Sequence, residues 1–161
     1  MKSNCFRCRH FGCYCPKRDN ICPPDMEGIK SFGYIYTLAD SETDTIAGGS
    51  AIEFSTNGPL YNISHAIGAE SITIKNSGSY LINYSINAQG NPNAIVALAV
   101  NNIVNTSTRI KLLTANTHVF GTAILNLTAN DTLTLVNDSD FNLTIDRNPI
   151  VGAQITIAQL S

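Results

Sequence analysis

The longest regular alternation of apolar and polar residues in the chain lies at residues 78–87, GSYLINYSIN. Every second position in this stretch carries a large apolar or aromatic side chain, namely Tyr80, Ile82, Tyr84 and Ile86. In an extended strand these side chains share one face, because successive side chains alternate across the backbone. The stretch therefore predicts a half-buried β-strand.

Similar segments continue over residues 31–161, separated by turn residues about every 8–12 positions. No segment keeps the 3.6-residue period of a helix. The predicted strands are 32–38, 51–55, 71–75, 78–87, 94–100, 103–104, 119–127, 132–136, 143–145 and 154–160, with turns at 57–59 and 101–102. This pattern predicts an all-β fold, a sandwich or barrel of antiparallel strands with almost no helix.

Residues 94–100, AIVALAV, differ from the other strands because both of their faces are apolar. One interpretation is a central strand whose outer face is crossed by a covering loop. The other, which we favour, is a strand whose outer face is buried by another subunit. A continuous apolar outer face on a monomer would promote aggregation.

The composition of the chain changes sharply near residue 30. All five cysteines of the 161 residues precede residue 23, at Cys5, Cys8, Cys13, Cys15 and Cys22. Residues 1–30 carry six Lys/Arg against three Asp/Glu, whereas residues 31–161 carry four against nine. A segment this short cannot build its own apolar core without disulfides, a metal or a partner. We therefore divide the chain into an irregular, cysteine-rich N-terminal arm at 1–30 and one domain at 31–161.

The cysteines of the arm allow three interpretations. Cys5-x-x-Cys8 together with His10 offers half of a zinc or iron–sulfur site. The Cys13-x-Cys15 pair has the wrong spacing for the other half of a zinc knuckle. A reduced, disordered tail is the second interpretation. The third, which we favour, is disulfide crosslinking, because an odd number of cysteines leaves at least one sulfur per chain free or bonded to another chain.

The domain contains no recognisable set of catalytic residues. His65 and His118 lie far apart in the sequence, without an acidic or serine partner at a characteristic spacing. Residues 137–140, Asn-Asp-Ser-Asp, resemble part of a calcium loop but lack the glycine and the bidentate glutamate of an EF-hand, so we interpret them as a turn. We expect no enzyme activity, no catalytic residue, no cofactor and no metal site.

Charge and hydropathy restrict the partners of the chain. A mildly acidic domain is poorly suited to bind nucleic acid. No run of about 18 apolar residues occurs, so no membrane span is expected. The first residues include basic side chains but no apolar stretch behind them, so no secretory signal peptide is expected.

Four stretches of the domain resemble one family of proteins. They are 31–36, SFGYIY; 54–60, FSTNGPL, followed by Ile63-Ser64-His65; 78–82, GSYLI; and 123–137, AILNLTANDTLTLVN. In this order they resemble the spore-surface BclA-type domain of the complement-head and tumour-necrosis-factor jelly-roll superfamily, across residues 31–161. Asn130-Asp131 stands where the family usually has Gly-Asp, and asparagine tolerates the same left-handed backbone.

The resemblance implies a jelly-roll sandwich of about ten antiparallel strands that assembles as a tight homotrimer, with both termini close together at one end. Such trimers bury apolar strands around their threefold axis. The residues expected at the trimer interface are therefore Ile95, Ala97, Leu98 and Val100. Family members commonly carry a collagen stalk, whereas here the cysteine-rich arm takes that place. The chain is in this respect similar to subunits of thin endospore-appendage fibres that stack such trimers head to tail.

We therefore expect a structural subunit of a bacterial spore-surface assembly, either an endospore appendage fibre or the exosporium. Docking of the arm and disulfides from its cysteines would couple each trimer to adjacent trimers of the same or a related protein. The alternative is a trimeric head at the spore surface that binds a carbohydrate or a receptor. The resemblance also accounts for a spore-surface location without a signal peptide, since spore-envelope proteins are made in the mother cell and released when it lyses.

Overall fold

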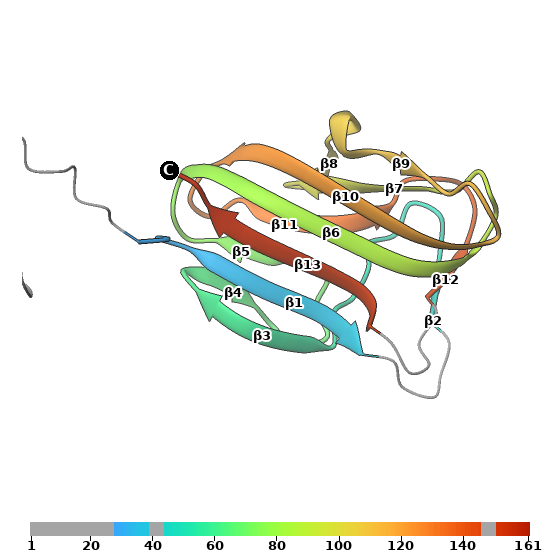
Figure 1. Ribbon diagram of the computed structural model, residues 1–161, viewed down its shortest axis with the longest axis horizontal. Coiled ribbons are helices and arrows are strands. Elements are labelled where there is room, and N and C mark those ends of the chain that lie inside the picture. Colours follow the sequence, from blue (N-terminus) through green and yellow to red (C-terminus); the bar gives the residue numbers. More distant parts are fainter. Residues whose placement is uncertain (1–27, 39–43, 146–150) are drawn as a thin grey trace, which may run out of the picture.

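The computed structural model describes residues 28–38, 44–145 and 151–161 (Figure 1). Within these ranges the chain forms β-strands and one three-residue 3₁₀ helix, η1 (Thr106–Thr108), so the predicted all-β class is confirmed. The strands are β1 (Phe32–Leu38), β2 (Asp44–Ile46), β3 (Thr56–Tyr61), β4 (Ile63–His65), β5 (Ile72–Ile74), β6 (Gly78–Gly90), β7 (Ile95–Val100), β8 (Ile103–Val104), β9 (Ile110–Lys111), β10 (Asn116–Leu127), β11 (Thr132–Asn137), β12 (Leu143–Ile145) and β13 (Val151–Gln159). The five cysteines of the arm lie outside the described residues.

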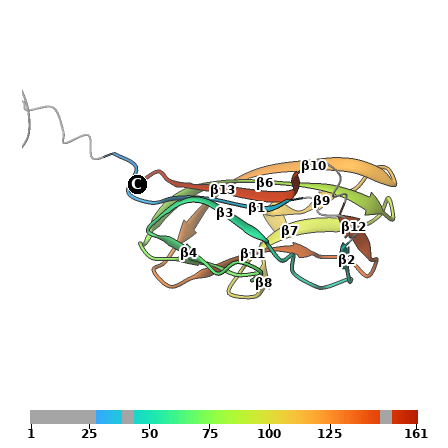
Figure 2. The same ribbon diagram turned by 90° about the horizontal axis from the view of Figure 1, so that it is seen from below.

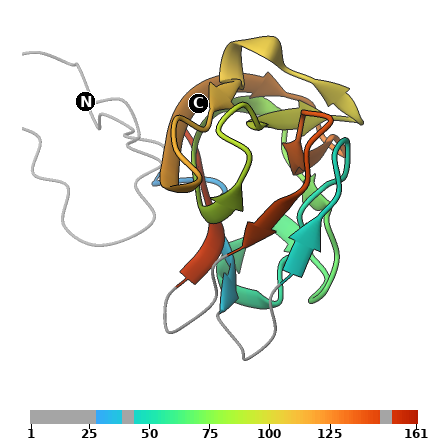
Figure 3. The same ribbon diagram turned by 90° about the vertical axis from the view of Figure 1, so that its right-hand side faces the viewer.

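The strands form two antiparallel sheets that lie face to face (Figure 2). The seven-stranded sheet has the order β2-β12-β6-β13-β1-β3, with β10 paired to β6. The six-stranded sheet has the order β4-β5-β11-β7-β8, with β9 paired to β7. Figure 3 views this sandwich from the end that carries β2 and β12, opposite the C-terminus. The predicted antiparallel sandwich is confirmed.

The described residues contain more strands than the roughly ten that were expected. The additional strands are short, namely the three-residue β2 and β4 and the two-residue β9. An alternation of apolar and polar residues needs about four positions to be recognised. These three strands are therefore recognised from their backbone pairing, which the sequence does not display.

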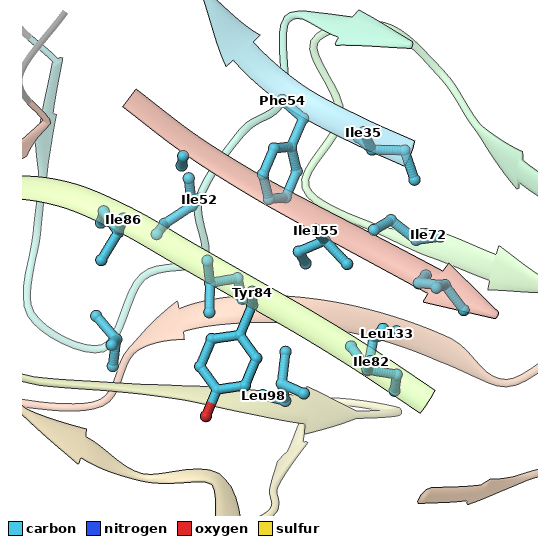
Figure 4. Packing of buried hydrophobic residues seen from close by; sticks show 14 of the residues in the cluster. Ile35, Ile52, Phe54, Ile72, Ile82, Tyr84, Ile86, Leu98, Leu133 and Ile155 are labelled. Carbon is cyan, nitrogen blue, oxygen red and sulfur yellow. The ribbon is translucent and has the colours of Figure 1, made fainter. Parts of the chain in front are cut away.

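The buried face predicted for residues 78–87 is confirmed, since its four alternating side chains on β6 are at most 2% exposed. They pack against side chains from both sheets and from the segment that leads into β3 (Figure 4). Prominent members of this single core are Ile35, Phe54, Ile72, Leu98, Leu133 and Ile155. Each large apolar side chain buried in this way stabilises the fold by about 1.5–3 kcal/mol.

The prediction for residues 51–59 is wrong in its placement of the strand. The strand in this region is β3, which runs through the predicted turn at 57–59. Of residues 51–55, where a strand was expected, Ala51 alone makes a bridge, to Val136 on β11. The strand therefore lies at 56–61, and residues 52–55, where a strand was expected, are irregular.

The position of β3 at the edge of its sheet explains this difference. Proline is accepted on an edge strand or at a bulge, and Pro59 lies on the edge strand β3 where its register with β1 is irregular. Gly58 allows a close approach to β1, since a Cβ at this position would lie 2.8 Å from Cδ1 of Tyr34. Gly58 and Pro59, which often form turns, are therefore compatible with an edge strand that lies close to the Tyr34 ring.

Two asparagine turns agree with the prediction. Asn101 and Asn102, between β7 and β8, have φ angles of 51° and 63°, the left-handed values that a two-residue hairpin turn requires. Asn130, which stands in place of the family's glycine, has a φ of 74°. Asparagine adopts this backbone more readily than most other residues.

Gly121 on β10 makes room for the aromatic ring of Tyr84. The two residues are paired across β10 and β6, and the Tyr84 ring fills the space that a Cβ at position 121 would need. The Tyr84 hydroxyl donates a hydrogen bond to the carbonyl oxygen of Thr108, which holds the ring in place. Burial raises the pKa of Tyr84.

Gly121→Ala should displace the Tyr84 ring and lower the free energy of unfolding by about 1–3 kcal/mol. Chemical denaturation followed by circular dichroism would measure the change. Gly28→Ala is the matched control, because nothing lies within 4 Å of a Cβ at that position. Equal stability of the two variants would contradict the packing that we assign to Tyr84.

Candidate assembly surface

The structure places the four residues expected at a trimer interface in two different environments. Ala97 and Leu98 are 0% exposed within the single chain, whereas Ile95 and Val100 are partly exposed. Leu98 belongs to the core between the sheets. Leu98 thus lies in the interior of the protomer, whereas Ala97 lies on the outer side of β7 and is covered by neighbours in the same chain.

The pairing of β7 gives the physical reason for this arrangement. β7 lies between β11 on one side and β8 and β9 on the other, so it is a central strand. Its inward side chains complete the core, and its outward residues Ala97 and Ala99 are small enough to be covered by their neighbours in the same chain. Of the two interpretations given for residues 94–100, the central strand agrees with the structure of the protomer.

A different surface, the outer face of the seven-stranded sheet, exposes large apolar side chains. Phe120 and Ile124 on β10 are 60% and 63% exposed. The strand register places Phe120 opposite Ser85 on β6, and Ile124 opposite Leu81. The residues that face outward on β6 have paired neighbours on β13, and these in turn have paired neighbours on β1. Three of the β1 residues are aromatic. We define this outer face by Phe32, Tyr34, Tyr36, Leu81, Asn83, Ser85, Phe120, Thr122, Ile124, Gln154, Thr156 and Ala158.

None of the residues of this outer face is charged. The central part of protein interfaces is depleted in charged residues and enriched in aromatic ones. Large apolar side chains exposed together on one uncharged face commonly mark a contact surface. The sequence prediction did not identify this surface, because the strand 119–127 carries apolar residues on both faces and its alternation does not separate them.

The polar groups of the outer face are bonded to one another within the protomer. The Tyr34 hydroxyl donates to Oε1 of Gln154 at 2.8 Å, and Nε2 of Gln154 donates to Oγ of Ser85 at 3.0 Å. Thr122 donates to Oδ1 of Asn83 at 2.8 Å. A partner can cover these groups at little cost, because they already have partners of their own.

Two tyrosines stack at the β1 side of the outer face. The ring centroids of Tyr34 and Tyr36 lie 4.8 Å apart, with an angle of 22° between the ring planes. Burial raises the pKa of Tyr34, and the proximity of Tyr36 raises it further. The Tyr34 hydroxyl therefore stays protonated, and remains a hydrogen-bond donor, to a higher pH than a free tyrosine.

A buried polar cluster fixes the end of the body from which the arm leaves. Ser31 donates to Oε1 of Gln159 at 2.7 Å, and Nδ2 of Asn76 donates to Oγ of Ser31 at 3.1 Å. Nε2 of Gln159 also donates to the carbonyl oxygens of Ser77 and Ser161, at 3.2 and 2.9 Å. The first and last residues of the body therefore lie together, as expected.

The two histidines of the domain do not come together in the structure. His65 is buried, with Nδ1 2.6 Å from Oδ1 of Asn57 and Nε2 3.0 Å from the carbonyl oxygen of Ala69. His118 is exposed on β10. His65 thus ties β4 to β3 and to the following loop, which is a structural role.

The segment 137–140 is a turn organised by a buried amide. Nδ2 of Asn137 donates to the carbonyl oxygens of Ile46, Ala47 and Phe141. Its Oδ1 accepts a hydrogen bond from Ser139 at 2.7 Å. The part of the chain that the structure describes contains no group of three His, Cys, Asp or Glu side chains that could hold a metal ion. In the same residues, no helix is long and apolar enough to cross a membrane.

Comparison with solved structures defines the class of the fold. The structure of Eiger TNF from S. frugiperda matches with a TM-score of 0.61 at 13% sequence identity, covering 81% of this chain and 94% of that chain. The globular domain of zebrafish complement 1qA protein matches with a TM-score of 0.54 at 13% identity, covering 82% and 98%. Murine APRIL at pH 5.0 matches with a TM-score of 0.52 at 10% identity, covering 81% and 98%. The domain is a jelly roll of the kind found in TNF and complement 1q heads.

The family follows from the sequence match. The family model of the BclA C-terminal domain matches residues 33–161, so the chain belongs to this family. This confirms the resemblance drawn from the four sequence stretches. A search of curated proteins found no match.

Proposed function

We propose that this chain is a structural head domain of a bacterial spore-surface assembly, an endospore appendage fibre or the exosporium. In this proposal the body forms a homotrimer through the outer face of the seven-stranded sheet, and the cysteine-rich arm couples one trimer to the next. The observation that carries the proposal is the uncharged, aromatic outer face, which is far better suited to contact protein than water. Membership of the BclA C-terminal domain family supports a location at the spore surface.

The geometry of β10 supports a closed ring of three copies. A cyclic trimer needs two different patches on each subunit, one packing against the other in the next copy. β10 pairs with β6 alone, so it forms an edge of the sheet. Phe120 and Ile124 project from this edge strand, and the stacked Tyr34 and Tyr36 lie on β1, across β6 and β13. Packing the β10 side of one copy on the tyrosine side of the next would close the ring.

The arm supplies the connection between trimers in this proposal. The polar cluster around Ser31 and Gln159 fixes the root of each arm at one end of the body. Three arms would therefore leave a trimer from the same end, which makes the connection directional. Five cysteines in each arm leave at least one sulfur per chain available for a bond to another chain.

Deletion of residues 1–22 should leave trimers that no longer form higher assemblies, because the cysteines and most basic residues of the arm are removed. Electron microscopy and light scattering, with and without reductant, would follow the assembly. The matched control is a full-length chain in which the five cysteines are replaced by serine, which retains docking but not disulfides. Fibres that persist after the deletion would contradict the proposal, whereas discrete particles of the intact chain that bind glycans would favour the binding head.

A further inference from the structure

The outer face of the six-stranded sheet contains a hollow of about 430 Å³. Its floor includes Ala99 on β7 and Thr134 on β11, which are paired with each other and are both buried. The hollow exists because the side chains of the floor are small, while the segment 49–51 and Val104 on β8 form walls around it. The apolar outer side of β7, which the core does not use, is therefore part of a concave surface.

The charged residues that line the hollow are acidic. Glu70 is exposed at its rim, and Asp138 lies in its wall. Among the residues that the structure describes, no lysine or arginine lines it. Asp138 does bind Arg109 from outside the hollow, with Nε and Oδ2 2.5 Å apart, so Glu70 carries most of the remaining negative charge. A ligand with an apolar group and a positive charge would match both the floor and the rim.

One segment of this chain has these properties. Residues 1–18 contain five Lys/Arg and no Asp/Glu, and they include the aromatic residues Phe6, Phe11 and Tyr14. Residues 1–27 can span at most about 90 Å when extended, which is enough to reach the body of a neighbouring trimer. The aromatic residues lie among basic ones, so one short stretch can place a ring on the Ala99 floor and a positive charge at Glu70.

We propose that residues 1–18 of one copy dock in this hollow on a copy in an adjacent trimer, with an aromatic side chain on the floor and basic side chains toward Glu70 and Asp138. The inference rests on the proposed function, since it names the partner surface of the arm. It is consistent with the trimer surface, because the hollow lies on the opposite sheet. Trimer formation would leave the hollow open.

A zero-length carbodiimide crosslinker tests this proposal, because it joins a carboxylate to an amine only when the two are in contact. Trimers of the full chain are prepared separately with natural and with heavy nitrogen, mixed and allowed to assemble. Mass spectrometry should then find crosslinks between Glu70 of one isotope form and Lys2 or Lys17 of the other. Glu53, an exposed carboxylate outside the hollow, is the internal control.

Charge exchange provides a second readout. Glu70→Lys should raise the concentration needed for assembly about fivefold, the effect expected from one exposed ion pair. Arg7→Glu combined with Arg9→Glu should restore assembly in the Glu70→Lys background. Glu53→Lys should leave assembly unchanged.

The possible results of these experiments distinguish a failure of the docking site from a failure of the proposed function. Assemblies that form without crosslinks to Glu70, or with equal crosslinking of Glu53, would overturn the site but leave coupling by the arm intact. Crosslinks confined to one isotope form would overturn docking between trimers. An intact chain that never assembles beyond the trimer would overturn both.

Discussion

The double substitution Phe120→Asp with Ile124→Asp should convert the proposed trimer into folded monomers. Both side chains are exposed in the protomer, so the change does not disturb the core. In a trimer it would place six carboxylates in an uncharged surface without any basic partner among the residues of the outer face. Burial of unpaired charge is strongly unfavourable, so the dissociation constant should rise at least about a hundredfold.

Sedimentation velocity would measure the loss of the trimer, and circular dichroism melting would show that the monomer remains folded. Ile103→Asp is the matched control. Ile103 is 74% exposed on β8, in the other sheet, so a charge there should leave the trimer unchanged. A trimer that survives the double substitution would place the interface elsewhere on the domain.

Leu98→Asp should prevent folding of the protomer itself. Leu98 is fully buried in the core, where it is paired with Leu135 on β11. A carboxylate at this position would be buried without a partner, and the cost would match or exceed the total stability of a typical domain, about 5–15 kcal/mol. Leu98→Ala, which removes apolar contacts without adding charge, should cost about 2–5 kcal/mol.

Soluble yield and far-ultraviolet circular dichroism would report the loss of the fold. Asp138→Ala serves as the control, because Asp138 forms an ion pair with the half-exposed Arg109, and such a pair contributes about 0–1 kcal/mol. Folded Leu98→Asp protein would show that Leu98 does not belong to the core. The two predictions thus distinguish the residues that build the protomer from those that assemble it.

The sequence predicted the features that depend on local backbone geometry. The alternation in residues 78–87 identified the buried face of β6, because a strand places every second side chain on the same side. Asn101, Asn102 and Asn130 were expected to turn the chain, and their positive φ angles agree. The family was also recognisable, since its characteristic stretches occur in order along the chain.

The misplaced strand around β3 shows one limit of such reasoning. Pro59 and Gly58 normally indicate a turn, and they stand within a strand here because β3 is at an edge and Gly58 approaches Tyr34. Whether a strand lies at an edge depends on how distant segments pair. No local pattern contains that information.

Residue patterns alone indicated most strands and turns, the buried face of β6 and the family, because these depend on neighbours along the chain. Only the tertiary structure decided which apolar faces belong to the core and which remain for a partner. Leu98 and Phe120 are both apolar residues on strands, yet the opposing sheet covers Leu98, whereas Phe120 is left exposed. The reason is physical: alternation describes two sides of one strand, and burial depends on what the rest of the chain places against each side.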